Sequence, residues 1–398
     1  MKVGVVKEVL AGERRVAATP DTVRVMLKQG FEVVIEAGAG AEANYPDGLY
    51  SAAGAVIGTA SDAWAADIVA KVNPPTVAEV ELPREGSLLI GFIWPAQNKD
   101  LVARLAERRV SVLAMDQVPR ISRAQKLDAL SSLANIAGYR AVIEAATSYG
   151  SFFTGQVTAA GRVAPAKVLV IGAGVAGLAA VAAARGLGAI VRAFDTRAAV
   201  REQVQSLGAD FLEVTIAESG EGQGGYAKEM SPEFIAAEMA LFRAQAKEVD
   251  IVITTALIPG RPAPKLWLAD MVALMKPGSV VVDLAARNGG NCELTQPDHV
   301  VVAHGVTIVG HLDLTSRLPP PASQLYGTNI THFLDDLGKA AGFRLDLTDV
   351  VVRGALVAHE GQVTWPPPPL PAPTTPAAAK AAPKPAHSPE AVAARKET

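Results

Sequence analysis

The sequence contains few of the features that disulfide-stapled or nucleic-acid-binding proteins share. Cys292 is the only cysteine in 398 residues, so no disulfide can form within the chain, and we expect a reducing compartment. The formal net charge of -3 provides no basic excess to neutralise phosphates. Aromatic residues make up only 5% of the chain, which leaves little for base-stacking platforms. Composition therefore argues against a nucleic-acid binder.

Secretory and membrane signals are also missing. The N-terminus, MKVGVVKEVLAGERR, becomes charged after six residues and has no secretory apolar region. Residues 168–184 carry no charge, and a run of that length can span a membrane. Its glycines at 172, 174 and 177 instead favour a buried strand that turns directly into a buried helix. We therefore expect a soluble chain without a transmembrane segment.

What the sequence does contain is a repeated alternation of short apolar runs and helix-like segments. This pattern predicts an α/β fold with two Rossmann-like, doubly wound parallel-sheet domains. The length allows an N-terminal domain at 1–130, completed by 326–365, and a nucleotide-binding domain at 131–325. Strands are predicted at 2–6, 32–38, 67–72, 88–94 and 110–115, then at 167–171, 189–195, 249–255, 279–284 and 306–311.

Three helices and a tail follow from local signals. Thr19 is a candidate N-cap before Pro20, so a helix should run from there to about Gly30. A helix at about 124–149 is expected to carry the chain into the second domain, and one at 329–342 to carry it back. The segment 366–398 holds ten of the 27 prolines and little that can pack, so it is expected to be an extended, mobile tail.

The stretch RISRAQKLDALS, residues 120–131, places polar side chains at every third position. In a helix, Gln125, Asp128 and Ser131 would stack on one face. Apolar residues at 127, 130, 133, 134 and 137 would pack on the core from the opposite face. The polar stripe is either a solvated helix face or a binding surface, and periodicity alone leaves both open.

A glycine fingerprint predicts a dinucleotide site in the second domain. Gly172, Gly174 and Gly177 follow a strand and open an alanine-rich helix, which is the context that the fingerprint requires. The first glycine permits the tight turn, the second lets backbone approach a pyrophosphate, and the third lets helix and strand pack closely. Backbone N–H groups near Val175 and Ala176 would face the phosphates at the positive helix end.

Asp195 ends the next strand at the expected spacing. Its carboxylate can accept both ribose hydroxyls of NAD and repel the extra phosphate of NADP, so NAD is favoured. Arg197 can pair with a 2′-phosphate, but such an arginine is more often solvated. A second glycine-rich stretch, at Gly38, Gly40 and Ala43, is rejected because a turn rather than a helix should follow it.

The stretch GEGQGGYAKEMS, residues 220–231, predicts a flexible segment. It includes Gly225 and Tyr226, and the tyrosine offers one aromatic ring that can close over a ligand. An ordinary surface loop, in which the tyrosine anchors the next helix, is the alternative.

Taken together, these pieces resemble the superfamily of alanine dehydrogenase and nicotinamide nucleotide transhydrogenase. The resemblance covers roughly residues 1–345 and rests on KEVLAGERRVAATP, GYRAVIEAA, GAGVAGLAA, TTALIPGRPAP and VVVDLAARNGGNCE. It implies two α/β domains, the first completed by a C-terminal segment, with the nucleotide in the cleft between them.

Three positions distinguish the branches of this superfamily. Oxidative deamination moves a proton as well as a hydride, so it needs a positioned acid/base and cations for the substrate carboxylate. By motif register, this chain has Asn73, Trp94 and Arg287 where alanine dehydrogenases have lysine, histidine and aspartate. Arg15 matches an arginine that both branches share. Hydride transfer between two nicotinamides requires only that the rings be held close and aligned. The residues therefore favour the transhydrogenase branch.

The resemblance also implies roles for individual residues. Arg120 and Asp128 would contact the nicotinamide carboxamide and ribose, Gln125 would reach toward the second nucleotide, and these three are the predicted catalytic residues. Tyr226 would close over bound NAD(H). The predicted nucleotide-binding residues are Arg120, Gln125, Asp128, Ser131, Gly172, Gly174, Val175, Ala176, Gly177, Asp195, Thr196, Arg197, Gly225, Tyr226, Thr255, Ala256 and Leu257, and no metal site is predicted.

The favoured hypothesis is the NAD(H)-binding subunit of a proton-translocating transhydrogenase. Because the chain has one glycine fingerprint and no credible membrane span, we expect NADP(H) and the proton channel on partner subunits. The resemblance further implies a homodimer that docks peripherally on the cytoplasmic face of the cell membrane. An NAD-dependent amino-acid dehydrogenase of the alanine type is the main alternative, and an NAD-sensing protein without chemistry is a third.

Overall fold

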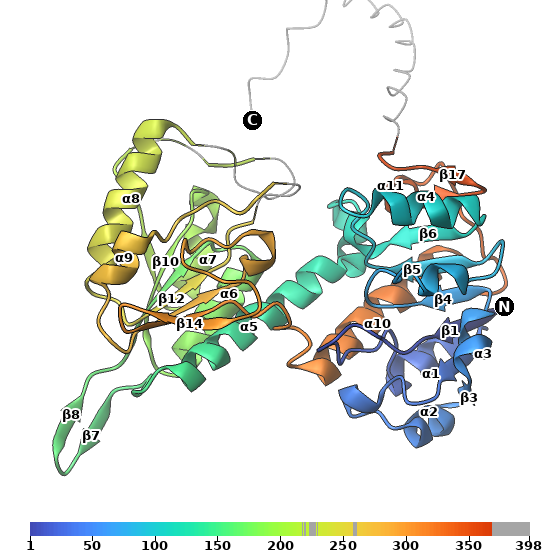
Figure 1. Ribbon diagram of the computed structural model, residues 1–398, viewed down its shortest axis with the longest axis horizontal. Helices are drawn as coiled ribbons and strands as arrows, with labels where there is room; N and C mark the ends of the chain where they lie inside the picture. The colour runs from blue at the N-terminus through green and yellow to red at the C-terminus, as the bar shows by residue number, and fades with distance from the viewer. Residues whose placement is uncertain (217, 219, 223–227, 229, 258–260, 368–398) are drawn as a thin grey trace, which may run out of the picture. The chain divides into compact units, whose positions relative to one another are not determined.

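The computed structural model describes residues 1–367 apart from 217, 219, 223–227, 229 and 258–260 (Figure 1). The predicted tail, 366–398, lies outside the described residues from 368 onward. Two large sheets organise the described part of the chain, and each is mostly parallel with helices packed against it. The predicted α/β class is therefore confirmed.

The first sheet has eight strands among the described residues, in the order β17-β16-β6-β5-β4-β1-β2-β3. All five predicted strands are present, whereas β3, β16 and β17 were not predicted. The edge strands β16 and β17 run antiparallel, so the sheet is not wholly parallel as expected. The bounds are β1 Lys2–Val5, β2 Glu32–Glu36, β3 Val56–Gly58, β4 Ile68–Ala70, β5 Leu88–Gly91, β6 Ser111–Ala114, β16 Leu356–His359 and β17 Gln362–Val363.

Both faces of the first sheet are buried. Ile68 and Ile90 belong to the apolar cluster on one face, and Val69 and Leu89 belong to the cluster on the other. This alternation explains the continuous apolar runs of the sequence, because neither face meets water. The covering helices are α1 Pro20–Lys28, α2 Asp47–Ala53, α3 Ala60–Trp64, α4 Lys99–Glu107 and α11 Val350–Ala355.

Helix α1 confirms the signal read from Thr19 and Pro20. The Thr19 side chain accepts the N–H of Thr22, the Thr22 hydroxyl accepts the N–H of Thr19, and Pro20 is the first helical residue. This reciprocal capping satisfies two N–H groups that a helix start leaves unpaired.

The second sheet has seven strands in the described residues, in the order β11-β10-β9-β12-β13-β15-β14. The order reverses between β9 and β12, which is the kind of switch point where ligands bind in open α/β sheets. Only the edge strand β14 is antiparallel within this sheet. The bounds are β9 Lys167–Ile171, β10 Ile190–Phe194, β11 Asp210–Leu212, β12 Ile251–Thr254, β13 Val280–Asp283, β14 Val300–Ala303 and β15 Val306–Val309.

Helices around the second sheet include α6, which begins directly after β9. The uncharged run 168–184 is therefore a buried strand followed by a helix, as predicted. Within the described residues, no helix is both long and apolar enough to cross a membrane. The bounds are α6 Val175–Gly186, α7 Arg201–Ser206, α8 Pro232–Ala246 and α9 Ala269–Leu274, and an unpredicted hairpin is formed by β7 Gln156–Thr158 and β8 Gly161–Val163.

Two long helices begin at positions other than those predicted. Helix α5 spans Ala129–Ser148 and is preceded by a 3₁₀ segment, Ser122–Leu127, so the expected start near 124 is wrong. Helix α10 spans Pro319–Asp336 and starts ten residues before the expected 329. Three prolines at 319–321 occupy its first turn, where their missing N–H groups cost nothing.

Helix α5 packs closely against the start of α6. A side chain at Gly138 would lie 1.9 Å from the carbonyl oxygen of Ala176, so only glycine permits this approach. The domain boundary near residue 130 stays a prediction, because residues 1–367 form one compact unit.

Candidate functional site

The glycine turn after β9 has the geometry that a dinucleotide site needs. Gly172 has a φ of +97°, in the region that favours glycine. A side chain at Gly177 would lie 1.8 Å from the carbonyl oxygen of Gly172. At Gly174 the nearest atom to an added Cβ is Nη2 of Arg197, 3.9 Å away, so there is room for a ligand to approach the backbone. Val175 and Ala176 then begin α6, so their N–H groups lie at its positive end.

The rejected glycine stretch serves packing instead. A side chain at Gly40 would lie 2.5 Å from the hydroxyl of Tyr50. A three-residue 3₁₀ segment, Ala41–Ala43, follows it, and α2 begins only at Asp47. No long helix start faces this turn, which agrees with its rejection.

Asp195 lies beside the glycine turn, just after β10. Its Oδ2 accepts the N–H of Ala173 at 2.7 Å, so the carboxylate is fixed to the turn. Its Oδ1 accepts both the backbone N–H and Nε of Arg197, at 2.9 and 2.8 Å. An ion pair of 2.7 Å joins Arg197 Nη2 to Oδ2. The expectation of a solvated Arg197 is wrong, because its side chain is only 17% exposed and the pairing raises its pKa.

The end of β12 closes the other side of the turn. Thr255 donates its hydroxyl to the carbonyl of Gly172 at 3.0 Å, and a side chain at Gly172 would lie 2.5 Å from that hydroxyl. Ala256 is held by Asn291, and Leu257 is 44% exposed. Thr196 follows Asp195 and has a buried hydroxyl without a hydrogen-bond partner among the described atoms. The structure thus brings the predicted residues of three strand ends to one place.

The stretch RISRAQKLDALS does form a pocket, but not on one helical face. Gln125 lies in the 3₁₀ segment, while Asp128 is the N-cap of α5, so the predicted helical stack of Gln125, Asp128 and Ser131 is wrong. Asp128 accepts the N–H and the hydroxyl of Ser131 at 2.9 and 2.6 Å. Arg120, Gln125, Asp128 and Ser131 nevertheless line one surface cavity of about 260 Å³. Arg120 and Gln125 are exposed.

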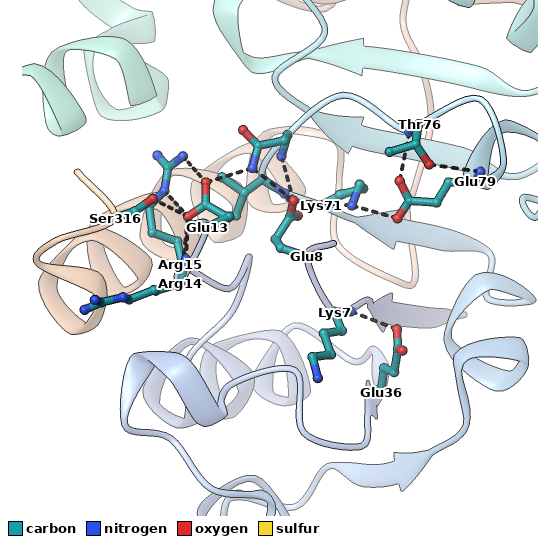
Figure 2. A network of polar contacts seen from close by, with 12 residues as sticks. Lys7, Glu8, Glu13, Arg14, Arg15, Glu36, Lys71, Thr76, Glu79 and Ser316 are labelled. Atoms are coloured by element: carbon teal, nitrogen blue, oxygen red, sulfur yellow. Dashed lines mark hydrogen bonds and ion pairs between the residues drawn. The ribbon is translucent and has the colours of Figure 1, made fainter. Parts of the chain in front are cut away.

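A buried charge network, which the sequence did not reveal, lies after the ends of β1 and β4 (Figure 2). We call Glu8, Glu13, Arg15, Lys71, Asn73, Glu79 and Ser316 the first-sheet network. Lys71 is 1% exposed and its Nζ lies 2.9 Å from Glu79 and 3.3 Å from Glu8. The Asn73 amide donates to Glu8 and to Glu13, at 3.0 and 2.8 Å. One side chain therefore bridges two carboxylates.

Glu13 neutralises Arg15 within this network. Nε and Nη2 of Arg15 donate to the two carboxylate oxygens at 2.8 and 2.5 Å, and the Ser316 hydroxyl donates at 2.6 Å. Burial alone would raise the pKa of Glu13, but the hydrogen bonds and charge of Arg15 lower it to about 2. For Glu8, burial raises the pKa against the opposing effects of Lys71 and Asn73.

Two predicted residues and the metal prediction need separate mention. Gly225 and Tyr226 lie outside the described residues. No metal site was predicted, and one group in the described part of the chain brings potential ligand atoms within 4.8 Å of one another: Asp298, His311 and Asp313. Asp313 is already paired with Arg317 at 2.7 Å.

Comparison with known families agrees with this geometry. The model described as "Alanine dehydrogenase/PNT, C-terminal domain" matches residues 141–366, and the corresponding N-terminal model matches residues 4–137. The chain belongs to the alanine dehydrogenase/PNT family. The resemblance inferred from the sequence motifs is thus confirmed.

The most similar relatives of this family member include transhydrogenase subunits. NAD(P) transhydrogenase subunit alpha of Haemophilus influenzae is 57% identical, covering 91% of this chain and 71% of the relative. An NAD(P) transhydrogenase alpha-subunit chain of Rhodospirillum rubrum is 45% identical, covering 92% and 98%. A solved transhydrogenase from Sinorhizobium meliloti has a TM-score of 0.85 at 43% identity, covering 91% of this chain and 100% of that one. A solved L-alanine dehydrogenase has a TM-score of 0.78 at 28% identity, covering 92% and 97%.

The positions that separate the two branches of the family lie in different surroundings. Asn73 is part of the first-sheet network. Trp94 is 40% exposed, has a φ of +53°, and stacks on Phe92 with 5.8 Å between ring centroids. Arg287 is exposed and donates to the carbonyl of Leu312 at 3.3 Å.

Sequence reasoning missed Asn291 and the carboxylates of the first-sheet network. Asn291 stands in the motif VVVDLAARNGGNCE, and Glu8 and Glu13 stand in KEVLAGERR, so both motifs were recognised without a role for these residues. Their partners come from distant parts of the chain, such as Ser316 and Pro264, and no local pattern predicts those pairings.

Proposed function

We propose that this chain binds NAD(H) and, together with an NADP(H)-binding partner, catalyses direct hydride transfer between the two nucleotides. The observation that carries the proposal is the state of Arg15 and Asn73. Arg15 is already paired with a carboxylate, and an amide bridges carboxylates where alanine dehydrogenases have a lysine. Such surroundings suit hydride exchange between two pyridine rings, which needs alignment rather than proton transfer from the substrate.

The roles that follow divide between two groups of residues. The glycine turn and the start of α6 would hold the pyrophosphate of NAD(H), with Asp195 at the adenosine ribose. Arg120, Asp128 and Ser131 would surround the nicotinamide and its ribose. Gln125, which is exposed at the rim of the same cavity, would reach toward NADP(H) on the partner. Tyr226 would close over the bound nucleotide.

The proposal extends to the complex in which the chain works. Relatives named as alpha subunits support partners that supply the NADP(H) domain and the membrane part. In this assembly hydride transfer would be coupled to proton translocation by the membrane subunits. The chain would be a homodimer attached peripherally on the cytoplasmic side of the membrane.

The direct test is reconstitution. The chain is mixed with a recombinant NADP(H)-binding domain, and hydride exchange is followed between nicotinamides that carry a deuterium label. We expect label to pass directly from one ring to the other, without exchange with water. Tight NADH binding without any label transfer would instead support an NAD-sensing protein.

An amino-acid dehydrogenase is the second candidate, favoured by the 28% identity and TM-score of 0.78 to L-alanine dehydrogenase. A steady-state assay of NADH formation from alanine and NAD decides between the two. We expect no rate above the background of enzyme without alanine. Turnover at a useful rate would replace the transhydrogenase proposal.

A further inference from the structure

We infer that Asn291 is a positioning residue for the proposed nucleotide site: its buried amide holds the loop after β12 in place beside the glycine turn. The inference rests on the proposed binding of NAD(H), because it assigns the loop a part in that site. Asn291 itself would not touch the nucleotide. It would act through Ala256 and through the segment that continues from it.

The amide of Asn291 holds this loop at both ends. Its Nδ2 donates to the carbonyl oxygens of Ala256 and Pro264, each at 2.9 Å. Its Oδ1 accepts the N–H of Ala256 at 3.0 Å. Both polar backbone groups of Ala256 are thus bound by one side chain, and the chain eight residues later is bound by the same amide. The three interactions use both N–H donors and the oxygen acceptor of the carboxamide, which no carboxylate or hydroxyl of similar size can reproduce.

The base of this clamp is rigid. Asn291 is 0% exposed, and its own carbonyl accepts the N–H groups of Leu266 and Trp267 at 2.9 and 3.0 Å. The next residue, Cys292, donates its N–H to Asp283 at 2.9 Å, and Asp283 lies at the end of β13. The clamp is therefore anchored to the strand next to β12 in the second sheet. A side chain fixed in this way keeps one orientation, as a supporting residue must.

The clamped loop continues directly from the glycine turn. Thr255 donates its hydroxyl to the carbonyls of Gly172 and Ile171, at 3.0 and 3.3 Å. Ala256, the next residue, is held by Asn291. Displacing Ala256 would therefore move Thr255 and change the shape of the turn. Because the Ala256 N–H is occupied by Asn291, the contribution of this loop to a ligand must come from other groups, such as the exposed Leu257.

The test is the substitution Asn291→Asp, which keeps the shape of the side chain. An ionised carboxylate would place an oxygen against two carbonyl oxygens, so we expect NADH to bind about tenfold or more weakly in a fluorescence titration. Lowering the pH should partly restore affinity, because protonation of the introduced carboxyl returns one O–H donor. A change that only destabilised the fold would not give this recovery. The matched control is Asn288→Asp, the same chemical change on an exposed neighbour, and it should bind as the wild type does.

The outcomes separate this inference from the proposed function. Wild-type protein that fails to bind NADH would contradict the proposed function and leave no site for Asn291 to support. Wild-type protein that binds NADH, with Asn291→Asp folded and equally tight across the pH range, would overturn the inference alone. If Asn291→Asp does not fold, Asn291→Ser is measured below its own melting temperature. Wild-type affinity in that variant would also overturn the positioning role, whereas weaker binding would support it.

Discussion

The two sheets treat the same topological position in opposite ways. After β9 the chain turns through glycines, so the carboxyl end of the strand presents backbone and open space. After β1 and β4 the chain places charged side chains, and these neutralise one another in the first-sheet network. Carboxyl ends of parallel strands are where ligands usually bind in such sheets. In this protein only the second sheet keeps that end available, and the first sheet uses its own end to hold the chain together.

The difference shows what a charged residue costs at each place. Lys71 and its two carboxylates are removed from water, so each depends on the others. Asp195 is also shielded, but its partner Arg197 lies on the same turn and is linked to it by neighbouring backbone. The first arrangement is a matter of stability, and the second can respond to a ligand.

The largest effect is expected from Lys71→Met, which sharpens the comparison by leaving Glu8 and Glu79 buried without their cation. We expect a loss of about 3–5 kcal/mol in the free energy of unfolding, measured by chemical denaturation. The control is Lys126→Met, because Lys126 forms an ion pair of 2.6 Å with Asp336 while 41% exposed. That pair should be worth less than about 1 kcal/mol. Equal losses in the two variants would show that the first-sheet network does not depend on its buried lysine.

A second prediction concerns Glu238, a buried acid on the α8 side of the second sheet. Burial, and then the charge of Asp195, raises the pKa of Glu238 to about 7. The unfolded chain ionises this group near pH 4, so between about pH 4 and 7 the folded state binds the extra proton and stability falls as pH rises.

The variant Glu238→Gln removes this penalty. We expect it to raise the free energy of unfolding by up to about 3 kcal/mol at pH 8 and to change it little at pH 4. Denaturation curves at the two pH values measure the difference. Glu233→Gln, on the exposed side of the same helix, is the control and should show no such pH dependence. A gain that is equal at both pH values would mean that ionisation of Glu238 is not the cause.

Sequence reasoning succeeded where the chemistry is local. The turn at Gly172, Gly174 and Gly177 and the cap at Thr19 depend on residues a few positions apart, and both were predicted with their structural context. It failed at the start of α5, because Asp128 caps the helix through its side chain and ends the 3₁₀ segment before it.

The first-sheet network was beyond prediction for a different reason. Its contacts join Glu13 to Asn73 and to Ser316, sixty and 303 positions away. Which carboxylate meets which cation is decided by strand order, and strand order depends on the whole sheet. The ion pair of Asp195 with Arg197 was misjudged more simply, since a spacing of two residues does not reveal burial.

A third prediction tests the open site through Asp195→Ala. Loss of the carboxylate removes the proposed ribose acceptor and frees Arg197 from its ion pair. We expect NADH affinity to fall about tenfold and the preference over NADPH to narrow, because Arg197 can then face a 2′-phosphate. Titrations with both nucleotides measure the ratio. The double variant Asp195→Ala with Arg197→Ala is the control, and it should bind NADPH less well than the single variant. An unchanged ratio would contradict the ribose assignment.

The smallest effect on nucleotide affinity is expected at Gln125, and the contrast with Asp195 makes it informative. Gln125 is exposed at the rim of the cavity that Arg120, Asp128 and Ser131 line, so it can meet a partner without shaping the floor of the site. Shortening it in Gln125→Asn should leave NADH affinity within about twofold of wild type and slow hydride transfer to the partner's nucleotide severalfold, because only the alignment of the two rings is disturbed. Single-turnover transfer with a recombinant NADP(H)-binding domain measures the rate, and an NADH titration on the same sample measures affinity. Lys126→Gln, at the next position and likewise exposed, controls for a general change of surface and should leave both quantities unaltered. A large loss of NADH binding in Gln125→Asn would place this side chain inside the first nucleotide's site and remove the division between a residue that binds and a residue that aligns.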